Sequence, residues 1–145
     1  MRRTSSTILL VEGRECDDLR LLYAFAQAGH TAPIEWTGDG VEAVAHLAGT
    51  GDYADHGLFP TPGLVIVGLD LDRGSGFQVL EWIQSSADLA GLPSVVLTSS
   101  RLPRDVQRAY ALGARDYRII PTSMADLVDV VREIERLWRE TDVPR

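Results

Sequence analysis

Lysine is missing from this sequence: all 14 basic residues among its 145 are arginines. Asp and Glu number 21, and the net charge of −7 argues against a nucleic-acid partner, which requires a basic surface. The single cysteine, Cys16, excludes an internal disulfide and a cysteine-rich metal cluster. Every apolar run is far shorter than a membrane span, so we expect a soluble protein with no membrane contact and, by default, a cytoplasmic location.

What the chain does contain is an alternation of short apolar runs and amphipathic segments. Buried strands are indicated at residues 7–11, 33–37, 64–67, 93–98 and 116–119. Apolar residues recur at helical spacing in residues 17–28, 41–47, 77–83, 104–112 and 124–139. This alternation predicts an α/β fold, a doubly wound, five-stranded and mostly parallel sheet with helices on both faces. No linker interrupts it, so we expect one domain over residues 1–145, with its core at residues 7–139.

The stretch GLVIVGLDLDRGSG, residues 63–76, contains the central strand and the loop that follows it. In an open α/β sheet, ligands and chemistry gather just beyond the carboxyl ends of the strands. Gly68, Leu69, Asp70 and Asp72 are therefore the first residues to consider for a functional site.

Six segments, in matching order and spacing, resemble the response-regulator receiver family. The subgroup they resemble most is the single-domain receivers associated with bacterial phytochromes and other sensor kinases. The segments are ILLVEG, GDGVEAVAHL, PGLVIVGLDLDRGSGFQVLEWI, LPSVVLTSS, RAYALGARDY and the pair Ile120 and Pro121. The resemblance implies a flavodoxin-like sheet with strand order 2-1-3-4-5 and a role in a two-component phosphorelay. It also implies a cis peptide bond between Ile120 and Pro121.

Receivers accept a phosphoryl group from a histidine kinase on an Asp that follows the third strand. The resemblance implies that two acidic residues after the first strand help to hold a divalent cation, and that a Thr or Ser and a Lys bind the phosphoryl oxygens. The corresponding positions here are Glu12, Gly13, Gly68, Thr98 and Ile120, with Tyr117 at the aromatic switch position and Pro121 after Ile120. The second carboxylate, the acceptor Asp and the Lys are therefore missing.

These departures argue against phosphoryl transfer. Gly68 has no side chain to accept a phosphoryl group, and Ile120 cannot donate to a phosphate oxygen. An arginine such as Arg118 supplies charge, but its planar fork does not reproduce an ammonium. Glu12 is a weak candidate for a metal ligand, so we expect no magnesium binding and an empty acidic pocket. The sequence indicates a degenerate pseudo-receiver without enzymatic activity, which acts by phosphorylation-independent protein–protein interaction.

Two alternatives stay open. In the first, Asp70 is the phosphoacceptor, which needs a two-residue slip from the Gly68 position; the other interpretation of Asp70 is a turn-forming residue in a glycine-rich loop. In the second, the vacated pocket near Gly13 and Gly68 binds a small ligand or anion.

The resemblance further implies that receivers signal through the face of the fourth helix, fifth strand and fifth helix, here within residues 103–138. Apolar residues on the last helix exceed what one internal face needs, and the candidate interface residues are Val128, Val131, Leu137 and Trp138. We expect a protein partner, a sensor histidine kinase or a phytochrome, and a homodimer through this face. Packing of Trp138 on its own domain is the competing interpretation.

Overall fold

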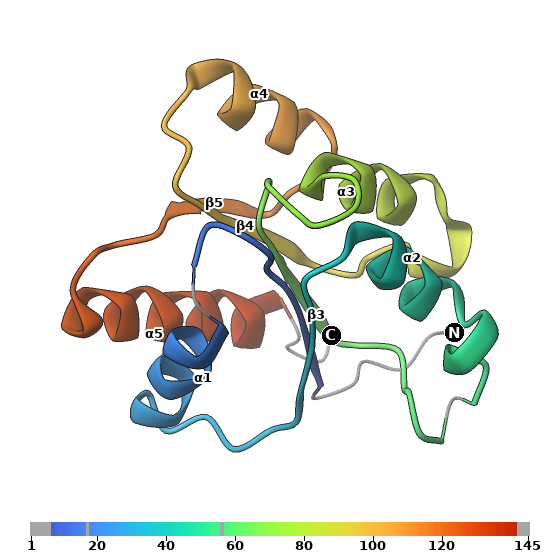
Figure 1. Ribbon diagram of the computed structural model, residues 1–145, viewed down its shortest axis with the longest axis horizontal. Coiled ribbons are helices and arrows are strands. Elements are labelled where there is room, and N and C mark those ends of the chain that lie inside the picture. The colour runs from blue at the N-terminus through green and yellow to red at the C-terminus, as the bar shows by residue number, and fades with distance from the viewer. Residues whose placement is uncertain (1–6, 17, 56, 142–145) are drawn as a thin grey trace.

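Five short runs of mainly aliphatic residues form one parallel sheet in the computed structural model, which describes residues 7–16, 18–55 and 57–141 (Figure 1). The strands are β1 (Ile8–Val11), β2 (Ile34–Thr37), β3 (Leu64–Val67), β4 (Ser94–Thr98) and β5 (Asp116–Ile119). Their order is β2-β1-β3-β4-β5, and every neighbouring pair is parallel. The predicted flavodoxin-like order is confirmed.

Each strand is followed by a helix, as the alternating pattern predicted. The helices are α1 (Asp18–Gln27), α2 (Gly40–Ala48), α3 (Gly76–Ser85), α4 (Pro103–Ala111) and α5 (Met124–Thr141). The loops after α2 and α3 also contain short 3₁₀ turns, η1 (Gly51–Tyr53) and η2 (Ala87–Leu89). The expected first residue of the first helix, Asp17, lies outside the described residues.

Local sequence sets where α2 begins and ends. The Asp39 carboxylate accepts hydrogen bonds from the N–H groups of Val41 (2.8 Å) and Glu42 (3.2 Å), which would otherwise lack helical partners. At the other end Gly49 adopts a left-handed conformation (φ 68°), which glycine tolerates without strain. The helix therefore starts directly after β2, at the carboxyl edge of the sheet.

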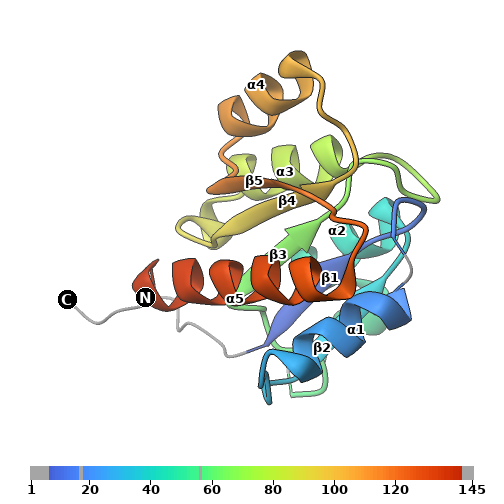
Figure 2. The ribbon, with the colours of Figure 1, turned by 90° about the vertical axis from the view of Figure 1, so that its left-hand side faces the viewer.

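Helices α1 and α5 lie together on one face of the sheet, and α2, α3 and α4 lie over the other (Figures 1 and 2). Alternate residues of β1 and β3 feed the two hydrophobic cores: Ile8 and Leu64 face α1 and α5, whereas Leu9 and Val65 face α2 and α3. Because both faces are covered, β1, β3 and β4 are buried along their whole length.

The structure corrects two of the proposed interface residues. Val128 and Val131 are 8% and 0% exposed, and both belong to the core shared by α1 and α5. Leu137 and Trp138 are half-buried against the same core. The spacing of apolar residues favoured one narrow buried stripe on α5, but this helix packs against both α1 and the sheet and buries a wider stripe. The homodimer itself stays a prediction.

The expected cis peptide bond before Pro121 is wrong, because the described residues contain no cis peptide. Trans is the favoured isomer even before proline, and a cis bond needs surrounding structure that enforces it. Here the Arg20 guanidinium donates to the carbonyls of Pro121 (2.8 Å) and Thr122 (2.7 Å) and ties the trans segment to α1. Separately, none of the described helices combines the length and apolarity required to cross a membrane.

Candidate functional site

The carboxyl ends of β1, β3, β4 and β5 meet at one edge of the sheet because the strands are parallel. Glu12, Gly68 and Ile120 each come directly after one of these strands, and Thr98 is the last residue of β4. The structure thus brings together the positions that the sequence singled out. The side chains of Glu12 and Glu15 lie between the loops after β1, β3 and β4, and we call the space that they fill the pocket.

Glu12 is a buried carboxyl group, 1% exposed. One of its oxygens, Oε1, accepts a hydrogen bond from the backbone N–H of Glu15 at 3.1 Å. Burial raises the pKa of Glu12 to about 8, with a further contribution from the charge of Glu15. Glu12 therefore retains its proton at neutral pH, and a protonated carboxyl group is a poor metal ligand.

Glu15 is the residue that the sequence argument missed, and its carboxylate fills the pocket that was expected to be empty. Its Oε2 atom accepts from the N–H groups of Leu69 (2.7 Å) and Asp70 (3.2 Å), in the loop after β3. Its Oε1 atom accepts from the Thr98 hydroxyl, and from the N–H (3.2 Å) and hydroxyl (3.3 Å) of Ser99. One side chain from the loop after β1 thus joins the loops after β3 and β4.

Gly68 leaves the space that the two glutamates use. A Cβ atom at this position would lie 2.6 Å from Oε2 of Glu12 and 3.0 Å from Oε2 of Glu15. Both separations are shorter than van der Waals contact, so any side chain at position 68 must displace one of the carboxyl groups.

Gly13 is glycine for a different reason, the close approach of three loops. A Cβ atom here would lie 2.9 Å from the carbonyl oxygen of Gly38 and 3.0 Å from Cα of Leu71. Both are backbone atoms, which cannot move aside as a flexible side chain can. Backbone packing at this corner of the fold therefore leaves no room for a side chain at position 13.

Asp70 presents its backbone to the pocket, and the residue itself is exposed. Its N–H donates to Glu15, as described above, and its carbonyl accepts from the N–H of Arg14 at 3.2 Å. An isolated bridge between Asp70 and Ser75 closes the loop after β3 into a turn. These contacts agree with the turn-forming interpretation of Asp70.

Thr98 links the pocket to the opposite end of the site. Its buried hydroxyl donates to Glu15 and accepts from the N–H of Ser100 at 3.2 Å. The carbonyl of Ser100 in turn accepts from the Tyr117 hydroxyl at 2.9 Å, and the Ser100 hydroxyl donates to Asp105 on α4 at 2.6 Å. Burial raises the pKa of Tyr117, so its hydroxyl remains a donor at neutral pH.

Ile120 packs against the core shared by α1 and α5. The nearby Arg118 pairs with Asp116 (2.6 Å) and with Glu133 on α5, and it does not pair with the glutamates of the pocket. Among the residues that the structure describes, no cationic side chain forms an ion pair with Glu12 or Glu15.

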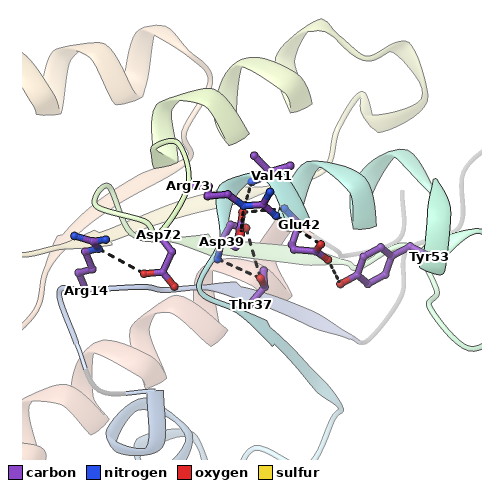
Figure 3. Close-up of polar contacts among 8 residues, drawn as sticks. All are labelled: Arg14, Thr37, Asp39, Val41, Glu42, Tyr53, Asp72 and Arg73. Carbon is purple, nitrogen blue, oxygen red and sulfur yellow. Dashed lines mark hydrogen bonds and ion pairs between the residues drawn. The ribbon is translucent and has the colours of Figure 1, made fainter.

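A network of ion pairs holds the loop after β3 against the start of α2 (Figure 3). Arg73 reaches Asp39 at 2.5 Å and Glu42 at 3.8 Å, while Asp72 lies 3.5 Å from Arg14. These pairs are exposed, so each contributes little to stability. Together with the bond from the N–H of Gly40 to the carbonyl of Arg73 (2.8 Å), they fix the loop whose N–H groups contact Glu15.

A flavodoxin-like sheet with an acidic residue, a hydroxyl and an aromatic side chain after β1, β4 and β5 defines a receiver-type protein. No protein-family model matches the chain. Individual relatives do. The chain is 36% identical, over 90% of its length and 82% of the relative, to the probable methanogenesis regulatory protein FilR2 of Methanothrix harundinacea. It is 32% identical, over 92% of its length and 89% of the relative, to the response regulator Rcp1 of a Synechocystis strain.

Solved structures agree with this assignment. The phosphorylated cyanobacterial phytochrome response regulator RcpA superposes with a TM-score of 0.85 at 29% identity, covering 97% of this chain and 98% of RcpA. The response regulator RPA3017, from red light signalling of R. palustris, gives a TM-score of 0.87 at 27% identity, covering 97% of this chain and 99% of RPA3017. The chain therefore belongs to the response-regulator receiver family.

Proposed function

We propose that this protein is a pseudo-receiver: a signalling protein of a two-component pathway that has lost the phosphoacceptor and acts by binding a protein partner. The observation that carries the proposal is the pair of residues Gly68 and Glu15. The acceptor position has no side chain, and a carboxylate from a neighbouring loop lies beside it, bonded to the loops after β3 and β4.

A receiver-type magnesium site does not fit these residues. Gly13 and Gly68 supply no carboxylate, and Glu12 holds its proton to a pKa of about 8. The Glu15 oxygens face hydrogen-bond donors, which suit an anion rather than a cation. Within the described ranges, no group of three or more His, Cys, Asp or Glu side chains is arranged to hold a metal. We therefore propose signalling without magnesium and without phosphoryl transfer.

Incubation with acetyl phosphate or a donor histidine kinase, followed by intact-mass measurement, tests this proposal. We expect no added phosphoryl group on the wild type. The alternative, phosphorylation at Asp70, predicts a stoichiometric mass increase that Asp70→Ala abolishes and Asp72→Ala, the matched control two residues away, retains. Such an increase would contradict the loss of phosphoryl transfer.

The partner surface that we propose is the face of α4, β5 and the exposed side of α5. Within α4 only Ala109 is buried, whereas Tyr110 on the helix and Leu102, the residue just before it, are 46% and 47% exposed. The edge strand β5 is half-buried along its length. Exposed apolar residues beside an open strand favour an interaction surface. Since several similar solved structures are phytochrome or bacteriophytochrome response regulators, a phytochrome or another sensor histidine kinase is the proposed partner, with a homodimer through the same face.

Light scattering at several protein concentrations tests the homodimer. We expect a dimer that weakens in Leu102→Ser and persists in Leu58→Ser, a control whose leucine is 69% exposed on the loop before β3. These substitutions are cleaner than Trp138→Ala, because Trp138 also contributes to the core. A monomer at all concentrations would contradict the homodimer.

The second alternative, a small ligand in the pocket, has less support, since the Glu15 carboxylate already occupies the space beside Gly68. Calorimetry with nucleotides and flavins tests it, and we expect no binding.

A further inference from the structure

The donors around the Glu15 carboxylate form a binding site for an oxyanion. The N–H groups of Leu69, Asp70 and Ser99 and the hydroxyls of Thr98 and Ser99 point at the two carboxylate oxygens. We call these five donors the cradle. They come from two loops, and the carboxylate comes from a third. Convergent N–H and O–H donors stabilise a negative charge, and hydrogen bonds to a charged acceptor are stronger than those between neutral groups.

The space beside Gly68 also fits the carboxylate of Glu15. With Gly68 at the end of β3, Oε2 of Glu15 would lie only 3.0 Å from a Cβ atom, so the anion sits close to the backbone. Thr98 is fully buried, and its O–H group would lose its hydrogen-bond acceptor if Glu15 left and nothing replaced it.

We propose that Glu15 is a tethered anion that occupies the cradle permanently. The cradle then accepts a free oxyanion, either a small monocarboxylate or inorganic phosphate, only after the Glu15 carboxylate is removed.

The tethered anion also connects to the proposed partner surface, and this step rests on the proposed function. Thr98 contacts Glu15 on one side and the N–H of Ser100 on the other. Ser100 in turn bonds both Tyr117 on β5 and Asp105 on α4. Permanent occupation of the cradle thus holds the loop after β4 and the α4–β5 face in one arrangement, without an external phosphoryl donor.

The experiment is rescue of a variant by the missing chemical group. Glu15→Ala removes the carboxylate and leaves a space that acetate fits. We expect this variant to melt about 5 °C below the wild type, and rising acetate to recover at least half of that loss in a saturable manner, with chloride at equal ionic strength as reference. Inorganic phosphate is the second probe and distinguishes a carboxylate-selective cradle from a general oxyanion site.

Two variants serve as controls. Glu15→Gln fills the same space but turns a donor toward the cradle, so we expect it to lose stability and not to respond to acetate. Asp72→Ala removes an exposed carboxylate from the neighbouring loop and should show no acetate response. The ¹⁵N–¹H signals of Leu69, Asp70 and Ser99 give a local readout: they should shift in Glu15→Ala and return toward wild-type positions with acetate. If Glu15→Ala does not fold, Glu15→Asp tests the same amides with a shorter side chain.

Unchanged amide signals in Glu15→Ala, or a stability loss that neither acetate nor phosphate reduces, would overturn the tethered anion. So would wild-type behaviour of Glu15→Gln. These outcomes are independent of the mass measurement that tests the proposed function. A phosphorylated wild type with normal acetate rescue would refute only the pseudo-receiver, and an unphosphorylated wild type without rescue would refute only the tethered anion.

Discussion

Replacing Glu12 with glutamine is expected to make the protein more stable at neutral and alkaline pH. The Glu12 carboxyl group is 1% exposed, and burial together with the charges of Glu15 and Asp70 raises its pKa from 4.5 to about 8. Glutamine has nearly the same shape as the protonated acid, and its amide oxygen can still accept from the N–H of Glu15. The variant therefore preserves the contact and removes the ionisation.

The direction in which stability changes with pH follows from the pKa of Glu12 in the unfolded and in the folded chain. An unfolded chain releases this proton above pH 4.5, whereas the folded chain holds it until about pH 8. The folded state binds more protons between these values, so its stability is full below pH 4.5 and falls as the pH rises. Each pH unit well inside the window corresponds to about 1.4 kcal/mol, and the effect is smaller near the two pKa values, so this group alone should lower the free energy of unfolding by about 3 kcal/mol between roughly pH 5 and pH 8.

Urea unfolding of the wild type and of Glu12→Gln, followed by circular dichroism at one-unit pH steps, measures this effect. We expect the stability difference in favour of the variant to widen by about 1 kcal/mol per pH unit. Titrating groups that do not interact with Glu12 contribute equally to both proteins and cancel in the difference. A difference that stays constant with pH would refute the argument that Glu12 is protonated in the folded state.

Three further predictions concern single side chains. Gly13→Ala should lower the free energy of unfolding by about 1–3 kcal/mol in urea titrations, because its methyl group would lie 2.9 Å from the backbone oxygen of Gly38 and 3.0 Å from Cα of Leu71. Burial lowers the pKa of His46, so as the pH decreases the imidazole is protonated in the unfolded chain before it is protonated in the folded one. The stability of the wild type should therefore decrease as the pH drops through about 6.5 and lower. His46→Phe should remove that part of the loss in thermal melts at acidic and neutral pH. His30→Phe should lower the free energy of unfolding, also measured by urea titration, by about 1–3 kcal/mol. The reason is that Oε2 of Glu135 would lose its buried partner, Nδ1 of His30, at 2.6 Å.

The fold could be predicted from the sequence because the apolar runs, the helical spacing and the turn and capping residues all indicated the same strands and helices. Unbroken aliphatic runs such as residues 64–67 fit strands buried on both faces, and the boundaries followed turn and capping residues such as Asp39 and Gly49. Resemblance to receivers then placed Glu12, Gly68 and Thr98 at one edge of the sheet, where the structure has them.

Glu15 was missed because nothing in a loop sequence states where a side chain points. Helical and strand periodicity assign directions to Val128 or Leu64, but Glu15 lies in an irregular segment whose path depends on backbone contacts of Gly13 with other loops. One signal was present: Gly13 and Gly68 stand where the resemblance to receivers leads one to expect acidic residues, and the unassigned Glu15 lies two residues after Gly13. That pattern indicates that a carboxylate from a nearby position enters the site.

The departures from the receiver pattern form one consistent set. Ile120 packs into the core, and in the part of the chain that the structure describes no cation pairs with Glu15, so only neutral N–H and O–H groups hold the anion. Five neutral donors match a single delocalised negative charge better than a phosphoryl group with nearly two, which would need a cation to balance it. A tethered carboxylate requires neither lysine nor magnesium. Under the proposed function, the absence of lysine, of an acceptor Asp and of a second acidic residue is explained by one exchange, in which the Glu15 carboxylate takes the place of an external phosphoryl group.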